Sequence, residues 1–114
     1  MQQPPHTPVI YDLYNNPLSG PEIEARSFAA IDAEAERGAH NDEQWEVIRR
    51  LIHTTADFAM AELTCFSADA FSACRAALKA GAPLYADSNM IRSGISVARL
   101  QALNPAYQRD DILC

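Results

Sequence analysis

Apolar residues recur at steps of three and four through the first half of the chain, which is the period of an amphipathic helix. Ser19-Gly20-Pro21-Glu22 has the residues of a capping box with an early proline, so it predicts a helix from about Pro21 to Arg37 that ends at Gly38. Ser27 lies among the apolar positions, which points its hydroxyl inward. A buried hydroxyl needs a hydrogen-bond partner, most often a main-chain carbonyl one turn earlier. The predicted apolar face consists of Ile23, Ala30, Ile31 and Ala35.

A second amphipathic pattern begins at Asn41, which is a suitable N-cap because Gln44 follows three residues later. The pattern continues to about His53 or Thr55, where two adjacent β-branched threonines weaken it. It predicts a second helix, whose core-facing stripe is Trp45, Ile48, Leu51 and Ile52.

The second half of the chain alternates between helical and strand-like stretches. Residues 56–66 leave the assignment open, although residues 63–66 have the composition of a short buried strand. Ser67 is expected to cap a helix over about residues 68–79 that closes at Gly81. The segment from Pro83 to Asp87 has the pattern of a strand that ends in a carboxylate.

Two short helices and a last apolar run complete the pattern. We expect Ser88 to cap a helix through Met90 that is broken at residues 93–94. Ser96 is expected to cap another helix through Leu103. The final residues, 110–114, have the pattern of an opening strand, so the chain is expected to stop within an element.

Helices and strands in this order are typical of an α/β domain with a parallel sheet. The expected fold class is therefore α/β, with helices packed on a mostly parallel sheet that is truncated within the sheet. Residues 1–20 are expected to form an N-terminal arm, in which residues 9–11 are either a short strand or extended chain, and residues 21–114 form the domain. Ligands of such sheets bind at the carboxyl ends of strands, which makes Asp87 and the helix start at Ser88 a candidate site.

Composition narrows the class of protein. The 114 residues are 48% hydrophobic, which is ordinary for a globular chain, and their net charge of −6 argues against a nucleic-acid partner. The N-terminus has no signal-peptide pattern, and no run approaches the roughly eighteen apolar residues of a membrane span. Three cysteines without zinc-ligand spacing, Cys65, Cys74 and Cys114, favour free thiols of apolar character in a reducing cytoplasm.

The stretch from Arg49 to Phe58 carries the densest set of candidate chemical groups. On a helix, Arg50, His53 and Asp57 would share one stripe, separate from the core-facing stripe. His53 could be a positioned acid or base, because a histidine ring takes up and gives off protons near neutral pH. An exposed helix end is the alternative, and the helical pattern alone leaves both open.

Five motifs follow one another along the chain: ARSFAAID (25–32), RRLIHTTADF (49–58), FSADAF (66–71), ALKAGAPLYADSNMIRSGI (77–95) and ARL (98–100). Together they resemble the N-terminal part of the precorrin-8X (cobalt-precorrin-8) methylmutase family over roughly residues 9–114. The resemblance implies an isomerase of cobalamin biosynthesis that moves a methyl group between adjacent ring carbons of a corrin precursor, giving hydrogenobyrinate or cobyrinate. It also implies a homodimer with a corrinoid polycarboxylate substrate and with no metal or organic cofactor.

The resemblance assigns roles by position. It implies that His53 is catalytic, that Ser27 and Arg50 contact the substrate, and that three further residues lie near it: Asp87, Met90 and Ser96. Simpler alternatives are a core hydroxyl for Ser27, a solvated Arg50, a strand-end cap for Asp87 and core packing for Met90.

The chain departs from the family pattern in two places. Glu24 stands where some members have tyrosine, and the family continues beyond the length of this chain with Gly-rich segments that are absent here. The alternative to an isomerase is therefore a corrinoid-binding module, or a fragment that is inactive without the missing half.

Overall fold

The computed structural model describes residues 14–114, which divide into two compact units between Cys65 and Phe66. The possible strand at residues 9–11 lies outside the described residues, and of the expected arm only residues 14–20 are described. The single domain expected over residues 21–114 stays a prediction.

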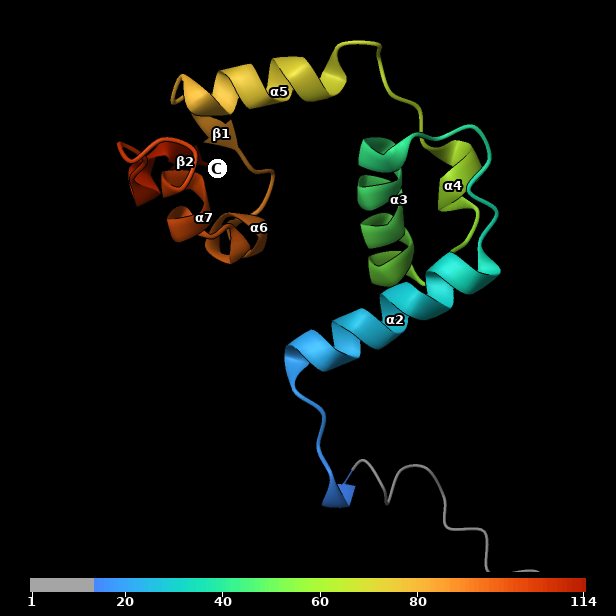
Figure 1. Ribbon diagram of the computed structural model, residues 1–114. Coiled ribbons are helices and arrows are strands. Elements are labelled where there is room, and N and C mark those ends of the chain that lie inside the picture. Colours follow the sequence, from blue (N-terminus) through green and yellow to red (C-terminus); the bar gives the residue numbers. More distant parts are fainter. Residues whose placement is uncertain (1–13) are drawn as a thin grey trace, which may run out of the picture. The chain divides into compact units, whose positions relative to one another are not determined.

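The first unit consists of helices α2 (Gly20–Glu34), α3 (Asp42–Thr55) and α4 (Met60–Leu63), and Figure 1 shows α4 alongside α3. The predicted capping box is present at the start of α2, since Ser19 N–H donates to Glu22 Oε2 at 2.8 Å and Glu22 N–H donates to Ser19 Oγ at 3.4 Å. The helix ends at Glu34, earlier than expected. Arg37 contacts the following loop instead, through a 3.0 Å hydrogen bond to the His40 carbonyl and an ion pair with Asp42.

Helix α3 matches its sequence prediction closely. Asn41 and Gln44 form the expected capping box, with side-chain to main-chain hydrogen bonds of 2.9 and 3.0 Å. The helix ends at Thr55, where Ala56 adopts a left-handed conformation with φ 54°. The core of this unit combines the predicted stripe of α3 with one residue each from α2 and α4: Trp45, Ile48, Ile52, Ile31 and Ala61 are buried.

The apolar face predicted for α2 is found only in part, and the strand considered at residues 63–66 is not found. Ile23 and Ala30, both expected on the apolar face of α2, are exposed, Ile23 by 53%. Leu63 ends helix α4 and the residues after it form no strand, because the main-chain N–H and the hydroxyl of Thr64 both donate to the Met60 carbonyl and so close the helix.

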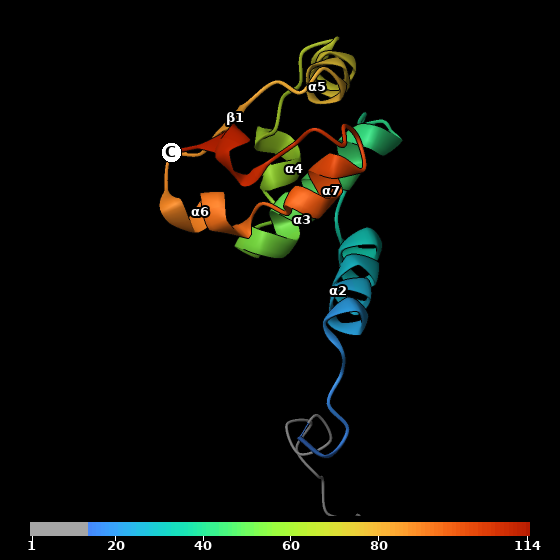
Figure 2. The same cartoon turned by 90° about the vertical axis from the view of Figure 1, so that its left-hand side faces the viewer.

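The second unit contains a short parallel strand pair with helices around it. In Figures 1 and 2 the strands are drawn between α5 above them and α6 below them. Leu84 pairs with Ile112 and Tyr85 with Leu113, so the expected α/β class with a parallel sheet is confirmed at the size of two strands. The elements are α5 (Ala70–Lys79), β1 (Leu84–Tyr85), α6 (Asn89–Gly94), α7 (Val97–Gln101), the 3-10 turn η1 (Arg109–Asp111) and β2 (Ile112–Leu113).

A small apolar core ties the strands of this unit to its helices. Leu100, Tyr107 and Ile112 are buried together, and the Tyr107 hydroxyl donates to the Ala82 carbonyl at 2.7 Å. Partly buried side chains around them come from α5, β1 and the α6–α7 region: Leu78, Leu84, Ile95 and Val97. Ile112 is fully buried in this core, and it anchors the strand-like run that the sequence predicted at the end of the chain.

Three of the four expected stops and caps in this unit are present. Ser88 and Ser96 cap α6 and α7, each accepting a main-chain N–H at 3.3 Å. Gly81 closes α5 at φ 78°, donating to the Leu78 carbonyl while Ala82 donates to that of Ala77, which is a Schellman motif.

Ser67 does not cap α5. Its hydroxyl donates to Asp69 and its carbonyl accepts from Ala70, which makes a turn, and the helix begins only at Ala70. Two expected helix ends also differ. Helix α6 runs through Ser93 to Gly94, and α7 ends at Gln101 rather than Leu103.

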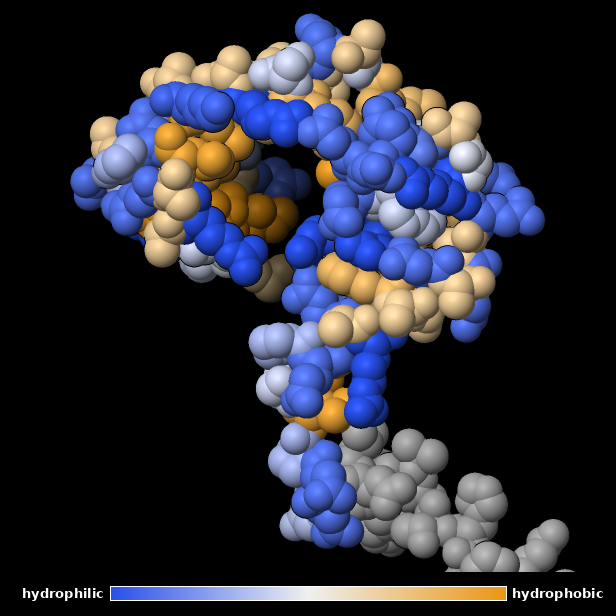
Figure 3. Space-filling view, viewed as in Figure 1, coloured by the Kyte–Doolittle hydropathy of each residue, from blue (hydrophilic) through white to orange (hydrophobic). Residues whose placement is uncertain are grey.

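Large apolar side chains remain exposed on both units. Orange surface, which marks hydrophobic residues, is visible on each of them in Figure 3. In the second unit the exposed side chains include one from each strand and two from α6: Tyr85, Leu113, Met90 and Ile91. Met90 is 83% exposed, which excludes the alternative that it packs in the core of this unit.

Candidate functional site

Helices α2 and α3 bring the two central residues of the sequence prediction into contact. Ser27 Oγ lies 2.7 Å from His53 Nδ1, a hydrogen bond that links residues 26 positions apart. The expected main-chain partner of Ser27 is therefore wrong, because its hydroxyl is half-buried and directed at the imidazole. His53 is exposed, so the ring can reach a ligand while one of its nitrogens is held.

The hydrogen bond at Nδ1 decides which nitrogen of His53 is available for chemistry. If the Ser27 hydroxyl donates to Nδ1, the proton of the neutral ring is on Nε2, which is then a hydrogen-bond donor. To act as an acid the ring must be the imidazolium, in which both nitrogens carry a proton and Nδ1–H donates to the Ser27 hydroxyl. If Nδ1–H of the neutral ring donates to the hydroxyl, Nε2 has a free lone pair and is a base. In each arrangement Nε2 is the ring nitrogen that can meet a ligand, because Nδ1 is hydrogen-bonded to Ser27.

Phe28 is a site residue that the sequence reasoning missed. Its ring meets the His53 ring edge-on, with centroids 5.3 Å apart and an interplanar angle of 75°. The guanidinium carbons of Arg49 and Arg50 lie 4.5 and 5.2 Å from its centroid, within cation–π range. The signal was available, because Phe28 follows Ser27 directly within the motif ARSFAAID, but an isolated phenylalanine gives no indication of what its ring contacts.

Arg50 stands one turn before His53 on α3 and pairs with Glu24 of α2. The distance from Arg50 Nη1 to Glu24 Oε1 is 2.8 Å, and the two side chains are 59% and 41% exposed. The structure therefore places Arg50 beside the Ser27–His53 pair, as the helical spacing predicted. It also gives Glu24 a definite partner, which the sequence did not indicate.

Asp57 does not belong to the same stripe, so this part of the sequence prediction is wrong. Helix α3 ends at Thr55 because the left-handed residue Ala56 turns the chain, and the hydroxyls of Thr54 and Thr55 bond to main-chain carbonyls of the last turn at 2.9 and 2.8 Å. The Asp57 carboxylate accepts the Ala59 N–H at 2.9 Å and so caps the next turn.

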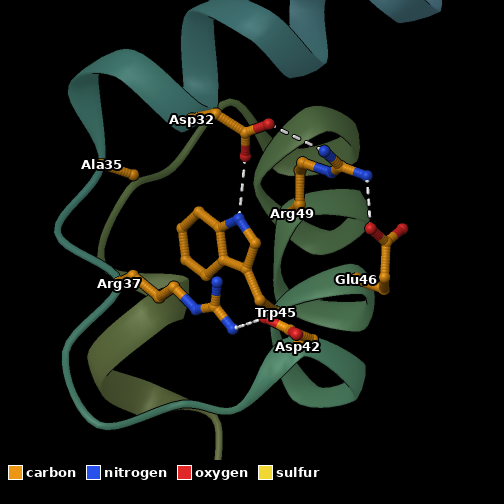
Figure 4. Close-up of a pocket in the computed structure, with 7 residues that line it drawn as sticks. All are labelled: Asp32, Ala35, Arg37, Asp42, Trp45, Glu46 and Arg49. Atoms are coloured by element: carbon orange, nitrogen blue, oxygen red, sulfur yellow. Dashed lines mark hydrogen bonds and ion pairs between the residues drawn. The ribbon is translucent and has the colours of Figure 1, made fainter.

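A polar concavity of about 360 Å³ is lined by residues near the end of α2 and in the first turns of α3 (Figure 4). Trp45 Nε1 and Arg49 Nη1 both donate to the Asp32 carboxylate at 2.8 Å, and Arg49 also pairs with Glu46. The Trp45 hydrogen bond, followed by Arg49, holds the pKa of Asp32 below its usual value. Neither Ser27 nor His53 lines this concavity, and every charged side chain that does has an ionic partner there, so we assign it to helix packing.

The second unit holds the other three predicted site residues. Asp87 is exposed between β1 and α6, and Ser88 rather than Asp87 caps that helix. The Ser96 hydroxyl is exposed and accepts the Arg99 N–H at the start of α7. Asp87 and Met90 follow the carboxyl end of β1, which is where the predicted α/β fold places a ligand site.

Two absences apply to the described part of the chain. Residues 14–114 contain no group of three or more His, Cys, Asp or Glu side chains arranged to hold a metal ion. Among the helices of the same residues, none has the length and apolar character that crossing a membrane requires.

These features define a class of protein before any comparison. It is an α/β chain in which a serine and a histidine from two packed helices form a hydrogen-bonded pair beside an exposed arginine.

Comparison with known proteins identifies the family. A sequence model described as CbiC: precorrin-8X methylmutase matches residues 22–109, and the chain belongs to this family. It is 43% identical over 82 residues to the cobalt-precorrin-8 methylmutase of Leptospira interrogans, an alignment that covers 72% of this chain and 37% of that protein. It is 38% identical over 91 residues to the precorrin-8X methylmutase of a Sinorhizobium species, with 80% and 43% covered.

A third relative shows the same relation. The cobalt-precorrin-8 methylmutase of Priestia megaterium is 32% identical over 80 residues, which are 70% of this chain and 36% of that protein. The chain thus spans about two fifths of the length of the curated relatives it matches. The family resemblance inferred from the five motifs is confirmed. It extends over only part of the length of the relatives.

Proposed function

We propose that this chain contributes to an isomerase of cobalamin biosynthesis, one that moves a methyl group between adjacent ring carbons of precorrin-8X or cobalt-precorrin-8. The observation that carries the proposal is the 2.7 Å hydrogen bond between Ser27 Oγ and His53 Nδ1. Membership of the methylmutase family supplies the substrate class. The chain covers only about two fifths of the length of its relatives. That these residues carry the activity is therefore itself part of the proposal.

His53 is the proposed proton-transfer residue, acting through Nε2. A methyl shift on a conjugated macrocycle requires the π-system to be biased by a proton at one ring position, and a histidine can supply or remove that proton near neutral pH. The Nδ1 hydrogen bond to Ser27 fixes the plane of the imidazole, so Nε2 meets the ligand in one orientation. No resident cofactor takes part in this scheme.

Arg50 is the proposed anchor for a substrate carboxylate. The corrinoid carries several carboxylates, and a guanidinium binds this group through paired N–H donors. The exposed position of Arg50 next to the Ser27–His53 pair supports this role. Asp87, Met90 and Ser96 are proposed substrate contacts, for which their exposure is consistent. We also propose that the protein is a homodimer. We place it in the cytoplasm, because three exposed free thiols are consistent with a reducing compartment.

A His53→Ala variant tests the isomerase. Removal of a positioned proton donor is expected to slow formation of hydrogenobyrinate from precorrin-8X by about 10²- to 10⁴-fold. The dissociation constant for hydrogenobyrinate should change by less than about tenfold, because His53 acts mainly on the transition state. Normal turnover by a folded His53→Ala variant, with folding checked by circular dichroism, would show that the assignment is wrong.

The second candidate function is a corrinoid-binding chain without turnover of its own. The exposed Arg50 beside the Ser27–His53 pair is consistent with ligand binding as well as with catalysis. Titration of the purified 114-residue chain with hydrogenobyrinate separates the two functions. Binding together with methyl migration supports the isomerase, and binding without migration supports the second candidate.

A further inference from the structure

The partner of Arg50 is itself a carboxylate, the same chemical group that the proposed ligand would present. Glu24 Oε1 contacts Arg50 Nη1 at 2.8 Å, and no second contact between the two side chains is recorded in the described residues. The pair is therefore bonded through a single nitrogen rather than as the two-point fork that arginine forms with a well-placed carboxylate.

The neighbouring arginine provides an internal comparison. Both arginines lie over the Phe28 ring, but Arg49 is 17% exposed and pairs with both Asp32 and Glu46. Arg50 is 59% exposed and has one acidic partner. An exposed ion pair of this kind contributes a factor of only about one to five to an equilibrium constant, because water and salt screen it. Of these two arginines, Arg50 is the one that can exchange its partner at little cost.

We propose that Glu24 is a competing carboxylate, which occupies Arg50 in the free chain and which a carboxylate of the incoming ligand displaces. The inference rests on the proposed function in one respect, namely that the ligand bound beside Ser27 and His53 is a polycarboxylate. A ligand oxygen bound at Arg50 Nη1 would lie within a few ångström of the Glu24 carboxylate, and two like charges at that distance repel. Glu24 therefore sets the affinity of Arg50 for acidic ligands without touching the reacting atoms.

The opposite role for Glu24 is also testable. A carboxylate can hold an arginine in the orientation that a ligand needs, in which case its removal weakens binding. The single, exposed contact favours competition, because it leaves the guanidinium loosely held while it neutralises its charge. The two roles predict changes of affinity in opposite directions.

The experiment measures hydrogenobyrinate binding to the 114-residue chain and to Glu24→Gln, which keeps the size of the side chain and removes its charge. Competition predicts that Glu24→Gln binds about two- to fivefold more tightly, the range set by an exposed ion pair. Glu34→Gln is the matched control, since it removes the same charge from the other end of α2. The control should change the affinity by much less than Glu24→Gln does.

A double-mutant cycle shows whether Glu24 acts through Arg50. In an Arg50→Gln background, the gain from Glu24→Gln should disappear, because there is no guanidinium to release. A gain that persists in this background, or a loss of affinity in Glu24→Gln itself, overturns the proposal while leaving the corrinoid-binding function in place.

A corrinoid-free measurement keeps the two proposals separate. Citrate serves as a simple polycarboxylate, and the NMR resonance of the Arg50 Nε–H reports its binding. The shift should saturate at lower citrate concentration in Glu24→Gln than in the unmodified chain. If the chain binds no hydrogenobyrinate but this difference is found, the proposed function fails and the role of Glu24 stands. Equal citrate titrations overturn the role of Glu24.

Discussion

At the scale of single residues, the site depends on how side chains from α2 and α3 divide their contacts. Ser27 holds one nitrogen of His53, and Phe28 contacts both His53 and the two arginines. Asp32 takes the hydrogen bonds of Trp45 and Arg49, which leaves Arg50 as the arginine next to the histidine with a single acidic partner. One helix–helix contact thus distinguishes Arg49, which packs between the helices, from Arg50, for which we propose a binding role.

Substitution of Ser27 by alanine tests its role in positioning the imidazole. The variant should lose the hydrogen bond to Nδ1, so the ¹⁵N resonance of that nitrogen is expected to shift and methyl migration to slow by about tenfold, as orientation is lost. Stability should fall by no more than about 1.5 kcal/mol, the net contribution of one hydrogen bond. Ser27→Thr retains the hydroxyl and is the matched control. An unchanged Nδ1 resonance in Ser27→Ala would contradict the predicted contact.

Acidification should destabilise the first unit through Asp32. The hydrogen bond from Trp45, followed by that from Arg49, lowers the pKa of this carboxyl in the folded chain. Its ionised form therefore stabilises the fold above the ordinary aspartate value of about 3.9, and this stability is lost as the pH falls through the lowered folded pKa.

Urea unfolding of the chain at a series of pH values checks this dependence. The free energy of unfolding should fall less steeply below about pH 4 in Asp32→Asn than in the unmodified chain. Asp110→Asn, in the second unit, is the control for loss of one acidic group. Equal slopes for Asp32→Asn and the unmodified chain would contradict the prediction. Low salt is needed, because the Asp32 side chain is 41% exposed and salt screens its charge.

At the scale of elements, caps and stops set where each helix presents its side chains. The capping boxes at Ser19 and Asn41 define the first turns of α2 and α3, and so they fix which faces carry Ser27 and His53. The end of α3 is set by Ala56 in the left-handed region, a conformation that glycine adopts more readily than alanine. This stop places Asp57 outside the site.

Ala56→Gly should stabilise the first unit. The left-handed conformation costs alanine about 1–2 kcal/mol, and the greater freedom of glycine in the unfolded chain offsets about 0.5–1 kcal/mol of the relief. A net gain of roughly 0.5–1 kcal/mol is expected from these two terms in urea unfolding. Ala59→Gly is the matched control, since Ala59 has φ −61° and should be destabilised by the same change. Destabilisation by Ala56→Gly would contradict the reasoning.

At the scale of the whole molecule, exposed apolar side chains and partial coverage of longer relatives occur together. Exposed side chains include Ile23, Phe58 and Leu63 in the first unit and Tyr85 and Met90 in the second, and the chain spans about two fifths of its relatives. In the second unit, the exposed Tyr85 and Leu113 are paired across the two strands, and such contiguous apolar surface is typical of an interaction surface.

We therefore expect the purified 114-residue chain to bind an apolar dye and to associate as its concentration rises. Sedimentation velocity at a series of concentrations, with a reductant present to keep the three exposed thiols free, measures the association. Tyr85→Lys places a charge on the outer position of β1 and should weaken it. A chain that stays monomeric over the full series, with no dye binding, would contradict the prediction.

Part of this molecule follows from local chemistry, which a sequence displays directly. The N-caps at Ser19, Asn41, Ser88 and Ser96, the Schellman stop at Gly81 and the buried stripe of α3 depend on residues within one or two turns of each other. The strand-like character of residues 84–85 and 112–113 follows from their apolar patterning, whereas their pairing with each other is a tertiary contact.

The contacts that make the site belong to the tertiary structure. Ser27 and His53, like Glu24 and Arg50, are 26 residues apart, and only the packing of α2 against α3 decides that they meet. The early end of α2 and the turn at Ser67 go with competing local hydrogen bonds, those of Arg37 to the following loop and of Ser67 with Asp69 and Ala70. The exposure of Met90 was not indicated by its position in the sequence. By itself, the sequence determined the helices and the candidate groups on them. The partners of those groups were decided by packing, because side chains on separate helices have no fixed spacing along the chain.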